Sequence, residues 1–208
     1  MRWSYLFIVW LSAAAYLVWW VSTNTLPDGF QNEYLLVGNA MDLWGALTTA
    51  DIWHLRWYMY TGYWPWGLYA APWPFMAIMG PTHLAMVLGN MIHLGVLLVA
   101  VNHMTRQLGG RWGALLVLLC PGVFGTLVRF EPNLAAIAWT AAGLAALTSS
   151  RGLQQRRWVW LYGACLGIGL MMDRLSVAFF LLPALLPLLL RINRRGLLHL
   201  CQGADLGG

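Results

Sequence analysis

Six long apolar runs constrain the fold of this chain more than any other feature of its sequence. The first, residues 3–21, is long enough to cross a hydrocarbon core of about 30 Å as a helix. Short polar connections separate the five further runs, which lie at about 84–102, 112–128, 133–149, 158–171 and 175–190. The pattern predicts an all-α integral membrane protein, a multispan bundle of about six transmembrane helices.

The composition supports this class and excludes others. Hydrophobic residues make up 60% of the 208 residues, charged residues make up 9%, and the mean hydropathy is +0.63, so a soluble globule would lack polar surface. The net charge of +5 comes from basic residues that are all Arg, and their positions between apolar runs indicate membrane topology rather than a nucleic-acid partner. The three Cys are far apart and predict neither a disulfide framework nor a zinc site.

We expect a single transmembrane domain over residues 1–195, followed at 196–208 by a short cytoplasmic tail, with its truncation left open. The first apolar run has no small-residue cleavage site, because Trp19 and Trp20 stand where a signal peptidase would cut. It therefore predicts an uncleaved anchor, with both Trp in the aromatic belt at the membrane interface.

An external loop is expected at residues 22–83, between the first two runs. Within it, residues 34–47 carry apolar side chains at steps of three and four, which predicts an amphipathic helix lying in the membrane interface. The aromatic stretch at 54–69 has two interpretations. It is either an interfacial belt or a groove that stacks sugar rings or covers a lipid.

Charges are segregated between the two faces of the predicted bundle. With the N-terminus in the cytoplasm, nine of the twelve Arg fall on the cytoplasmic side, as the positive-inside rule requires, and the C-terminus is cytoplasmic too. Six of the seven acids fall on the external side: Asp28, Glu33, Asp42, Asp51, Glu131 and Asp173. Acids contribute little to orientation, so this segregation points to a use for negative charge on the outer face. The expected location is a bacterial-type inner (plasma) membrane.

Two tight external hairpins each place an acid beside a base. Arg129 and Glu131 lie between the third and fourth runs, and Asp173 and Arg174 lie between the last two. Mutual neutralisation at a helix end is one explanation, because unpaired charge at membrane depth is costly. The other is that Arg129 or Arg174 binds an anionic lipid phosphate, which suits the guanidinium group.

Several familiar sites are absent from the sequence. A phosphate-binding loop with its Lys is excluded because the chain has no Lys, and no Gly-x-Ser-x-Gly nucleophile motif occurs. The five His show no metal-ligand spacing within one run. The remaining candidates for catalysis are acidic side chains. Glycosyl transfer needs a carboxylate as general base, and a second acid can hold a divalent cation, so Asp28 and Glu33 after the first run are the candidate pair.

Four short motifs carry a resemblance to a known family. They are Asn32-Glu33-Tyr34 ahead of the amphipathic helix, the stretch from Tyr63 to Tyr69 before the second run, Glu131-Pro132-Asn133 before the fourth, and Asp173-Arg174-Leu175-Ser176 before the sixth. Together they resemble the lipid-linked-sugar glycosyltransferases with multispan C-type folds. These include the protein O-mannosyltransferases and the aminoarabinose and galacturonic acid transferases of bacterial envelopes.

The resemblance implies transfer of a sugar from a polyprenyl-phosphate donor to a lipid, glycan or protein acceptor on the outer face. Glu33 or Asp28 would be the catalytic base, and both could bind a divalent cation, Mg²⁺ or Mn²⁺, as cofactor. Substrate contacts are expected from Arg129, Glu131, Asp173, Arg174, Trp57, Tyr63 and Trp64. The expected partners are membrane lipids and the donor, with no nucleic acid; no oligomeric state is predicted.

The chain departs from the family pattern in three places. Asn32-Glu33 stands where adjacent acids are common, and Pro65-Trp66-Gly67-Leu68 stands where a Pro-Pro-Leu turn is common. The first departure leaves the choice of base between Glu33 and Asp28 open. Such enzymes also carry roughly twice as many spans, so the chain resembles an N-terminal portion of one.

A non-enzymatic protein or a transporter, whose external acids bind a cation or a partner, is the alternative. A transporter needs polar residues along a path through its spans. Asn90, His93 and Thr140 are the main candidates for such a path, and their small number favours the enzyme.

The hypothesis also predicts how the site is assembled. If both hairpins and the loop after the first run lie at one face, a single bundle brings them together. We therefore expect a membrane-facing pocket lined by Asp28, Glu33, Arg129, Glu131 and Arg174.

Overall fold

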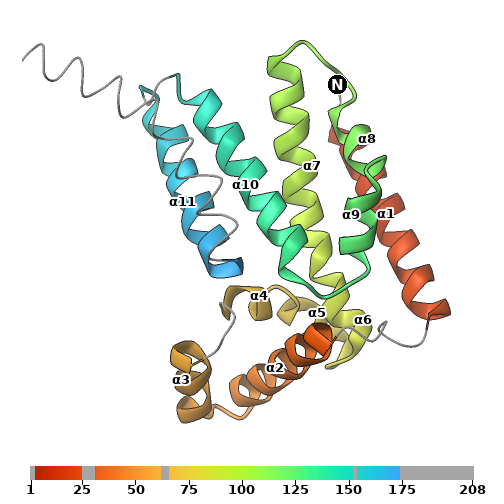
Figure 1. The fold of residues 1–208 in the computed structure, drawn as a ribbon, viewed down its shortest axis with the longest axis vertical. Coiled ribbons are helices and arrows are strands. Elements are labelled where there is room, and N and C mark those ends of the chain that lie inside the picture. Colours follow the sequence, from red (N-terminus) through yellow and green to blue (C-terminus); the bar gives the residue numbers. More distant parts are fainter. Residues whose placement is uncertain (1–2, 25–30, 62–65, 152–153, 174–208) are drawn as a thin grey trace, which may run out of the picture.

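The computed structural model describes residues 3–24, 31–61, 66–151 and 154–173 (Figure 1). Most of these residues belong to helices, and none of them forms a strand. The predicted all-α fold is therefore confirmed for them. The last apolar run and the tail at 196–208 lie outside the described residues.

Most helices coincide with the predicted runs, and the connecting segments supply shorter ones. In chain order they are α1 Trp3–Thr23, α2 Gln31–Thr48, α3 Ile52–Thr61, α4 Trp66–Ala70, α5 Trp73–Met79, α6 His83–Leu88, α7 Asn90–Gln107, α8 Gly113–Leu118, α9 Pro121–Leu127, α10 Pro132–Ser149 and α11 Arg156–Met172.

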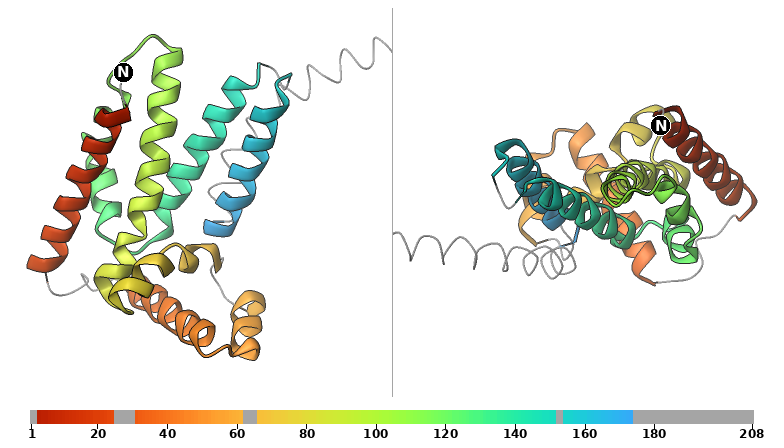
Figure 2. Two further views of the ribbon diagram at one scale, coloured as in Figure 1. Left: turned by 180° about the vertical axis from the view of Figure 1, so that it is seen from behind. Right: turned by 90° about the horizontal axis from the view of Figure 1, so that it is seen from above.

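The long helices α1, α7, α10 and α11 stand side by side (Figures 1 and 2). α1 packs on α7, α7 on α10 and α10 on α11, while α8 and α9 pack against α7. Helices α2 to α6 lie across the foot of this row, at the end where α9 passes into α10 and where α11 finishes. We call this the connector end; it comprises α2–α6, the turn at 128–131 and Asp173.

Among the residues that the structure describes, two helical segments are long and apolar enough to cross a membrane, Ser4–Thr23 and His83–Gln107. The second combines α6 and α7, which meet at Gly89. The backbone dihedral angles of Gly89 are helical (φ −54°, ψ −31°), so the backbone conformation stays helical across the junction. A Cβ at Gly89 would lie 3.0 Å from the Pro72 nitrogen, so glycine allows the start of α5 to approach the junction. Six spans and an interfacial α2 remain predictions.

The apolar run at 112–128 forms two short helices instead of one continuous span. Proline disfavours helical angles in the residue before it and has no N–H for the helix ladder. Cys120 is accordingly extended (φ −82°, ψ 111°), and Pro121 begins α9 as its first residue. A hydropathy pattern alone does not reveal this break.

The core lies where α1, α6, α7, α9 and α10 converge. Leu17, Met86, Leu94, Leu127 and Leu134 are all fully buried there. One polar bond reinforces the packing, because the Trp10 indole donates to the Met91 carbonyl at 2.8 Å. This bond fixes α1 against the first turn of α7, immediately above the connector end.

Candidate functional site at the connector end

The turn between α9 and α10 carries two of the predicted site residues, Arg129 and Glu131. Phe130 between them is 1% exposed and anchors the turn in the core, while both charged neighbours are half-buried. Glu131 is extended (φ −134°, ψ 155°) and precedes Pro132, the first residue of α10. The sequence folds this way because a proline is well suited to the first position of a helix.

A single amide side chain holds this turn in place. Asn90, at the start of α7, is 1% exposed and donates from Nδ2 to the carbonyls of Leu127 at 3.0 Å and Arg129 at 2.6 Å. A longer bond of 3.4 Å reaches the Thr126 carbonyl. Asn90 thus satisfies carbonyls that the end of α9 leaves without helical partners. Asn90, a candidate for the polar path of a transporter, therefore has a structural role.

Glu131 is oriented by its own helix. Its Oε2 accepts a hydrogen bond from Asn133 Nδ2 at 2.8 Å, and no hydrogen bond from its side chain caps α10. The carboxylate therefore lies beside the first turn of α10 and not over its axis. Arg129 and Glu131 come from one turn, as predicted.

Asp173 ends α11 at the same end of the molecule. Its backbone is extended (φ −151°, ψ 110°), its N–H donates to the Gly169 carbonyl at 2.9 Å, and its side chain is half-buried. α4 packs directly on this helix end. A Cβ at Gly67 would lie 2.6 Å from the Met171 carbonyl oxygen, so only glycine allows this approach.

α4 also contacts α2, the helix that carries Glu33 in its first turn. Asn39 Nδ2 donates to the Tyr69 hydroxyl at 3.3 Å, and Tyr69 is 2% exposed. Burial raises the pKa of Tyr69 above its usual range, and the bond from Asn39 opposes this effect. α4 therefore joins α2 to the end of α11. Sequence reasoning missed this link, because neither Asn39 nor Tyr69 stands in a recognisable motif.

Asp51, another of the acids predicted to be external, has a structural role. Asp51 Oδ1 accepts from the backbone N–H groups of Trp53 and His54, both at 3.1 Å, and its Oδ2 lies 2.6 Å from His54 Nδ1. This is helix capping of α3. The backbone bond from His54, followed by the bond to its ring, holds the pKa of Asp51 below its usual value.

The other predicted site residues are only partly placed. The backbones of Glu33 and Trp57 belong to α2 and α3, and the structure does not describe their side chains. Asp28, Tyr63, Trp64 and Arg174 lie outside the described residues altogether. Among the described side chains, no three His, Cys, Asp or Glu groups are placed to hold a metal ion. The divalent-cation site at Asp28 and Glu33 stays a prediction.

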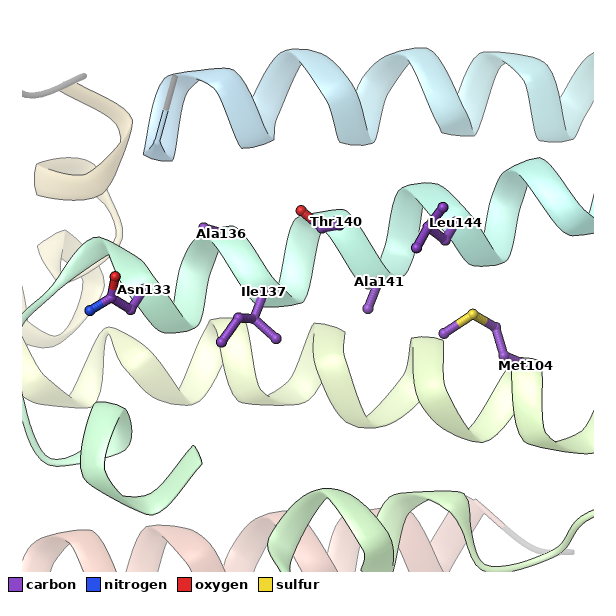
Figure 3. Close-up of a pocket in the computed structure, with 7 residues that line it drawn as sticks. All are labelled: Met104, Asn133, Ala136, Ile137, Thr140, Ala141 and Leu144. Carbon is purple, nitrogen blue, oxygen red and sulfur yellow. The ribbon is translucent and has the colours of Figure 1, made fainter. Parts of the chain in front are cut away.

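A pocket of about 490 Å³ runs along α10 (Figure 3). The described part of its lining is apolar except for two side chains, and consists of Met104, Asn133, Ala136, Ile137, Thr140, Ala141 and Leu144. It extends from Asn133, next to the turn at 128–131, towards Met104 near the other end of α7. Arg129 and Glu131, the two residues of the predicted shared pocket whose side chains are described, do not line this one, but Asn133 links it to Glu131 through their hydrogen bond.

The comparisons with known proteins gave one match. The profile of a family described as dolichyl-phosphate-mannose-protein mannosyltransferase matches residues 65–202, which is more than half of the chain. The matched range contains the turn at 128–131, α10, the pocket and Asp173, whereas Asp28, Glu33 and Trp57 precede it.

No curated protein matched the chain, and no solved structure matched it. The family match agrees with the family that the motifs resemble, and the apolar segment His83–Gln107 lies within the matched range. The chain belongs to the dolichyl-phosphate-mannose-protein mannosyltransferase family and is a membrane glycosyltransferase.

Proposed function

We propose that the connector end transfers a sugar from a polyprenyl-phosphate donor to a hydroxyl or amine acceptor on the outer face of a bacterial-type inner membrane. The observation that carries the proposal is the continuity between Glu131, Asn133 and the pocket along α10. A donor of this kind has a charged head and a long apolar chain. The turn and the pocket offer surfaces of both kinds within one structure.

The donor's chain would lie along α10, because the pocket lining is mostly Ala, Ile, Leu and Met side chains. Burial of each CH₂ group contributes about 0.8 kcal/mol, so a few isoprene units give substantial affinity. The donor's phosphate would then lie near the turn, where the Arg129 guanidinium is half-buried. Arg174 is the second proposed phosphate ligand. Glu131 and Asp173 would face the sugar, which Trp57, Tyr63 and Trp64 would stack against.

The proposed reaction is an inverting displacement. The acceptor's oxygen or nitrogen attacks the anomeric carbon, and the bond from that carbon to the phosphate oxygen breaks. The acceptor's proton passes to Glu33 or Asp28 as general base. The polyprenyl phosphate leaves with the bonding electron pair, and cationic side chains stabilise its charge. Six spans, with both termini in the cytoplasm and α2 in the outer interface, complete the proposed arrangement.

The assignment of the base can be tested with the full chain in proteoliposomes and a radiolabelled polyprenyl-phosphate sugar. Glu33→Gln and Asp28→Asn, made separately, should each lower turnover by about 10² to 10⁴-fold if both acids take part. Asp42→Asn is the matched control, because Asp42 is an exposed acid of the same helix as Glu33. Wild-type rates in both test variants would exclude the assignment.

The role of the pocket has its own test. Ala141→Trp fills the pocket, whereas Ala164→Trp adds the same bulk at an exposed position of α11 outside the pocket lining. Ala141→Trp should raise KM for a long-chain donor about tenfold or more and change KM for a two-isoprene donor little. Equal effects on both donors, or equal effects of both variants, would contradict a chain-binding pocket.

A further inference from the structure

The end of the bundle opposite the connector end carries charge of one sign. Among the described residues it holds five Arg, all exposed: Arg106, Arg111, Arg151, Arg156 and Arg157. They belong to the last turn of α7, the α7–α8 connection, the α10–α11 connection and the first turn of α11. The described acids Asp42, Asp51, Glu131 and Asp173 all belong to the connector end. We call these five residues the arginine end.

A polar network fixes the helices that present these residues. His103 Nε2 lies 2.7 Å from Ser149 Oγ, and Gln107 Nε2 donates to the same oxygen at 2.8 Å. Thr148 Oγ1 donates to Gln107 Oε1 at 3.2 Å. These bonds join the last turns of α7 and α10. The Arg residues on either side are therefore held on a common framework.

An aromatic contact extends this framework to α11. The His103 and Trp158 rings pack with their centroids 5.2 Å apart. The Arg157 guanidinium carbon lies 5.7 Å from the centroid of the Trp158 ring, within the range of a cation–π contact. The guanidinium is thus placed over a fixed ring, which reduces the conformational entropy that a ligand must overcome to use it.

Arg156 and Arg157 occupy an electrostatically unfavourable place in their helix. They are the first two residues of α11, and no acidic residue lies in its first turn. Helix N-termini carry partial positive charge, so cations there lower helix stability unless an anion is nearby. No acid among the described residues lies at this end of the bundle, so an anionic ligand beside Arg156 and Arg157 would be electrostatically favourable.

The position of the arginine end identifies the anion. Arg106 is next to last in the candidate span His83–Gln107, so it stands at the depth where a span meets lipid headgroups. Trp112, which immediately precedes α8, is 57% exposed, and Trp160 in α11 is 68% exposed; both helices begin at this end. Exposed Trp beside Arg at the end of a span is typical of a membrane interface. A lipid headgroup meets these residues without any approach from solution.

We propose that the arginine end binds the phosphate of an anionic glycerophospholipid, with Arg156 and Arg157 as its principal ligands. The planar guanidinium donates two parallel hydrogen bonds to phosphate oxygens, and Trp160 lies one helical turn from Arg156 on α11. The site is separate from the proposed position of the donor's phosphate and sugar, because it lies at the opposite end of α10 and α11. The proposal does not depend on the glycosyl-transfer reaction.

The test measures lipid binding to the purified full chain in detergent by native mass spectrometry. The probes are phosphatidylglycerol and phosphatidylcholine of equal chain length, with inorganic phosphate as a competitor. Phosphatidylglycerol should bind at least tenfold more tightly than phosphatidylcholine. Each Arg near an anionic surface contributes about fivefold in affinity, so R156Q/R157Q should weaken phosphatidylglycerol binding about 30-fold.

Two further variants control for folding and for general charge. R156K/R157K keeps both charges and should retain most of the affinity, which shows that the Gln variant loses charge and not structure. R56Q removes an exposed Arg from α3 at the connector end and should leave phosphatidylglycerol binding unchanged. Equal binding of the two lipids, or wild-type affinity in R156Q/R157Q, would overturn the proposal. Displacement of the lipid by low-millimolar inorganic phosphate would show a free-anion site and would overturn it too.

Discussion

The two ends of the bundle use charge in different ways. The connector end contains both acids and bases, and individual acids have assigned partners: Asp51 caps α3 and Glu131 accepts from Asn133. At the arginine end, the charges of the described Arg and acidic side chains are all positive, and the hydrogen-bond network beneath them consists of Ser, Thr, Gln and His side chains. The connector end holds individual charged side chains in a defined geometry, whereas the arginine end exposes a group of charges of one sign.

The difference extends to the way the chain connects its helices. Five helices, the 18-residue α2 and the shorter α3 to α6, link α1 to α7 at the connector end, whereas the connections at the arginine end span only a few residues. Loops and short elements on a rigid scaffold commonly carry function, because they can change without disturbing the core. Variants that damage one end and leave the other intact are therefore the way to test the comparison.

The largest effect is expected from Gly67→Leu. The new side chain would overlap the Met171 backbone and force α4 away from α11, at a cost of about 3 kcal/mol. Transferase activity should fall about tenfold or more, because α4 also supports α2. The test is activity in proteoliposomes together with phosphatidylglycerol binding, which should be unchanged. Gly125→Leu is the control, since a Cβ at Gly125 meets nothing within 4 Å. Parallel loss of lipid binding would show that the ends are not independent.

Asn90→Leu should have the next largest effect. It removes the bonds to the Leu127 and Arg129 carbonyls and leaves them buried, at a cost of about 1 to 3 kcal/mol. Thermal unfolding in detergent should show a lower Tm, and transferase activity should fall because the turn is released. Asn102→Leu is the matched control on the same helix, because its Oδ1 is buried with no hydrogen-bond partner among the described residues. A larger Tm loss in the control would refute the role assigned to Asn90.

Ser149→Ala tests the comparison of the two ends at the arginine end. It removes a hydroxyl shared by His103 and Gln107, and a typical hydrogen bond contributes about 1 kcal/mol net. Tm should fall slightly and phosphatidylglycerol binding should weaken, while transferase activity stays near the wild-type rate. Thr126→Ala, which removes a hydroxyl bonded within α9, is the control for loss of a hydroxyl. A drop in activity with unchanged lipid binding would contradict the assignment of the two ends.

The smallest effect is a pH dependence at Asp51. Its pKa is lowered in the folded protein, chiefly by the backbone N–H of His54, so the ionised form favours folding. The stabilisation is complete above the pKa of an unfolded Asp and is lost as the pH falls through the lower folded pKa. Melting curves between about pH 7 and pH 3 should therefore converge for wild type and Asp51→Ala at acidic pH. A constant difference in Tm across this range would contradict the prediction.

Hydrophobic patterning predicted the main helices well. The runs at 84–102, 133–149 and 158–171 correspond to α7, α10 and α11, and residues 34–47 fall within α2. These segments have the length and composition that determine helices locally. The run at 112–128 was not anticipated as two helices, because the effect of Pro121 on Cys120 is steric and does not alter hydropathy.

The site was only partly predictable. The pairing of Arg129 and Glu131 in one turn follows from the sequence, since a proline fixes the start of α10. The Asn90 bonds, the Asn39–Tyr69 bond and the pocket along α10 join residues far apart in the chain, and no local pattern specifies such contacts. The roles of Glu33, Asp28, Trp57, Tyr63, Trp64, Asp173 and Arg174 remain predictions.

The Asn90 bonds have a consequence for protein engineering. The turn at 128–131 owes its shape to a donor that lies 39 residues away from Arg129 in the sequence. Transplanting the segment Arg129–Phe130–Glu131–Pro132 into another helical hairpin would carry the charges but not the geometry. A transferable unit must include the first turn of α7 together with the turn, so swaps between relatives are best designed with breakpoints outside residues 90–133.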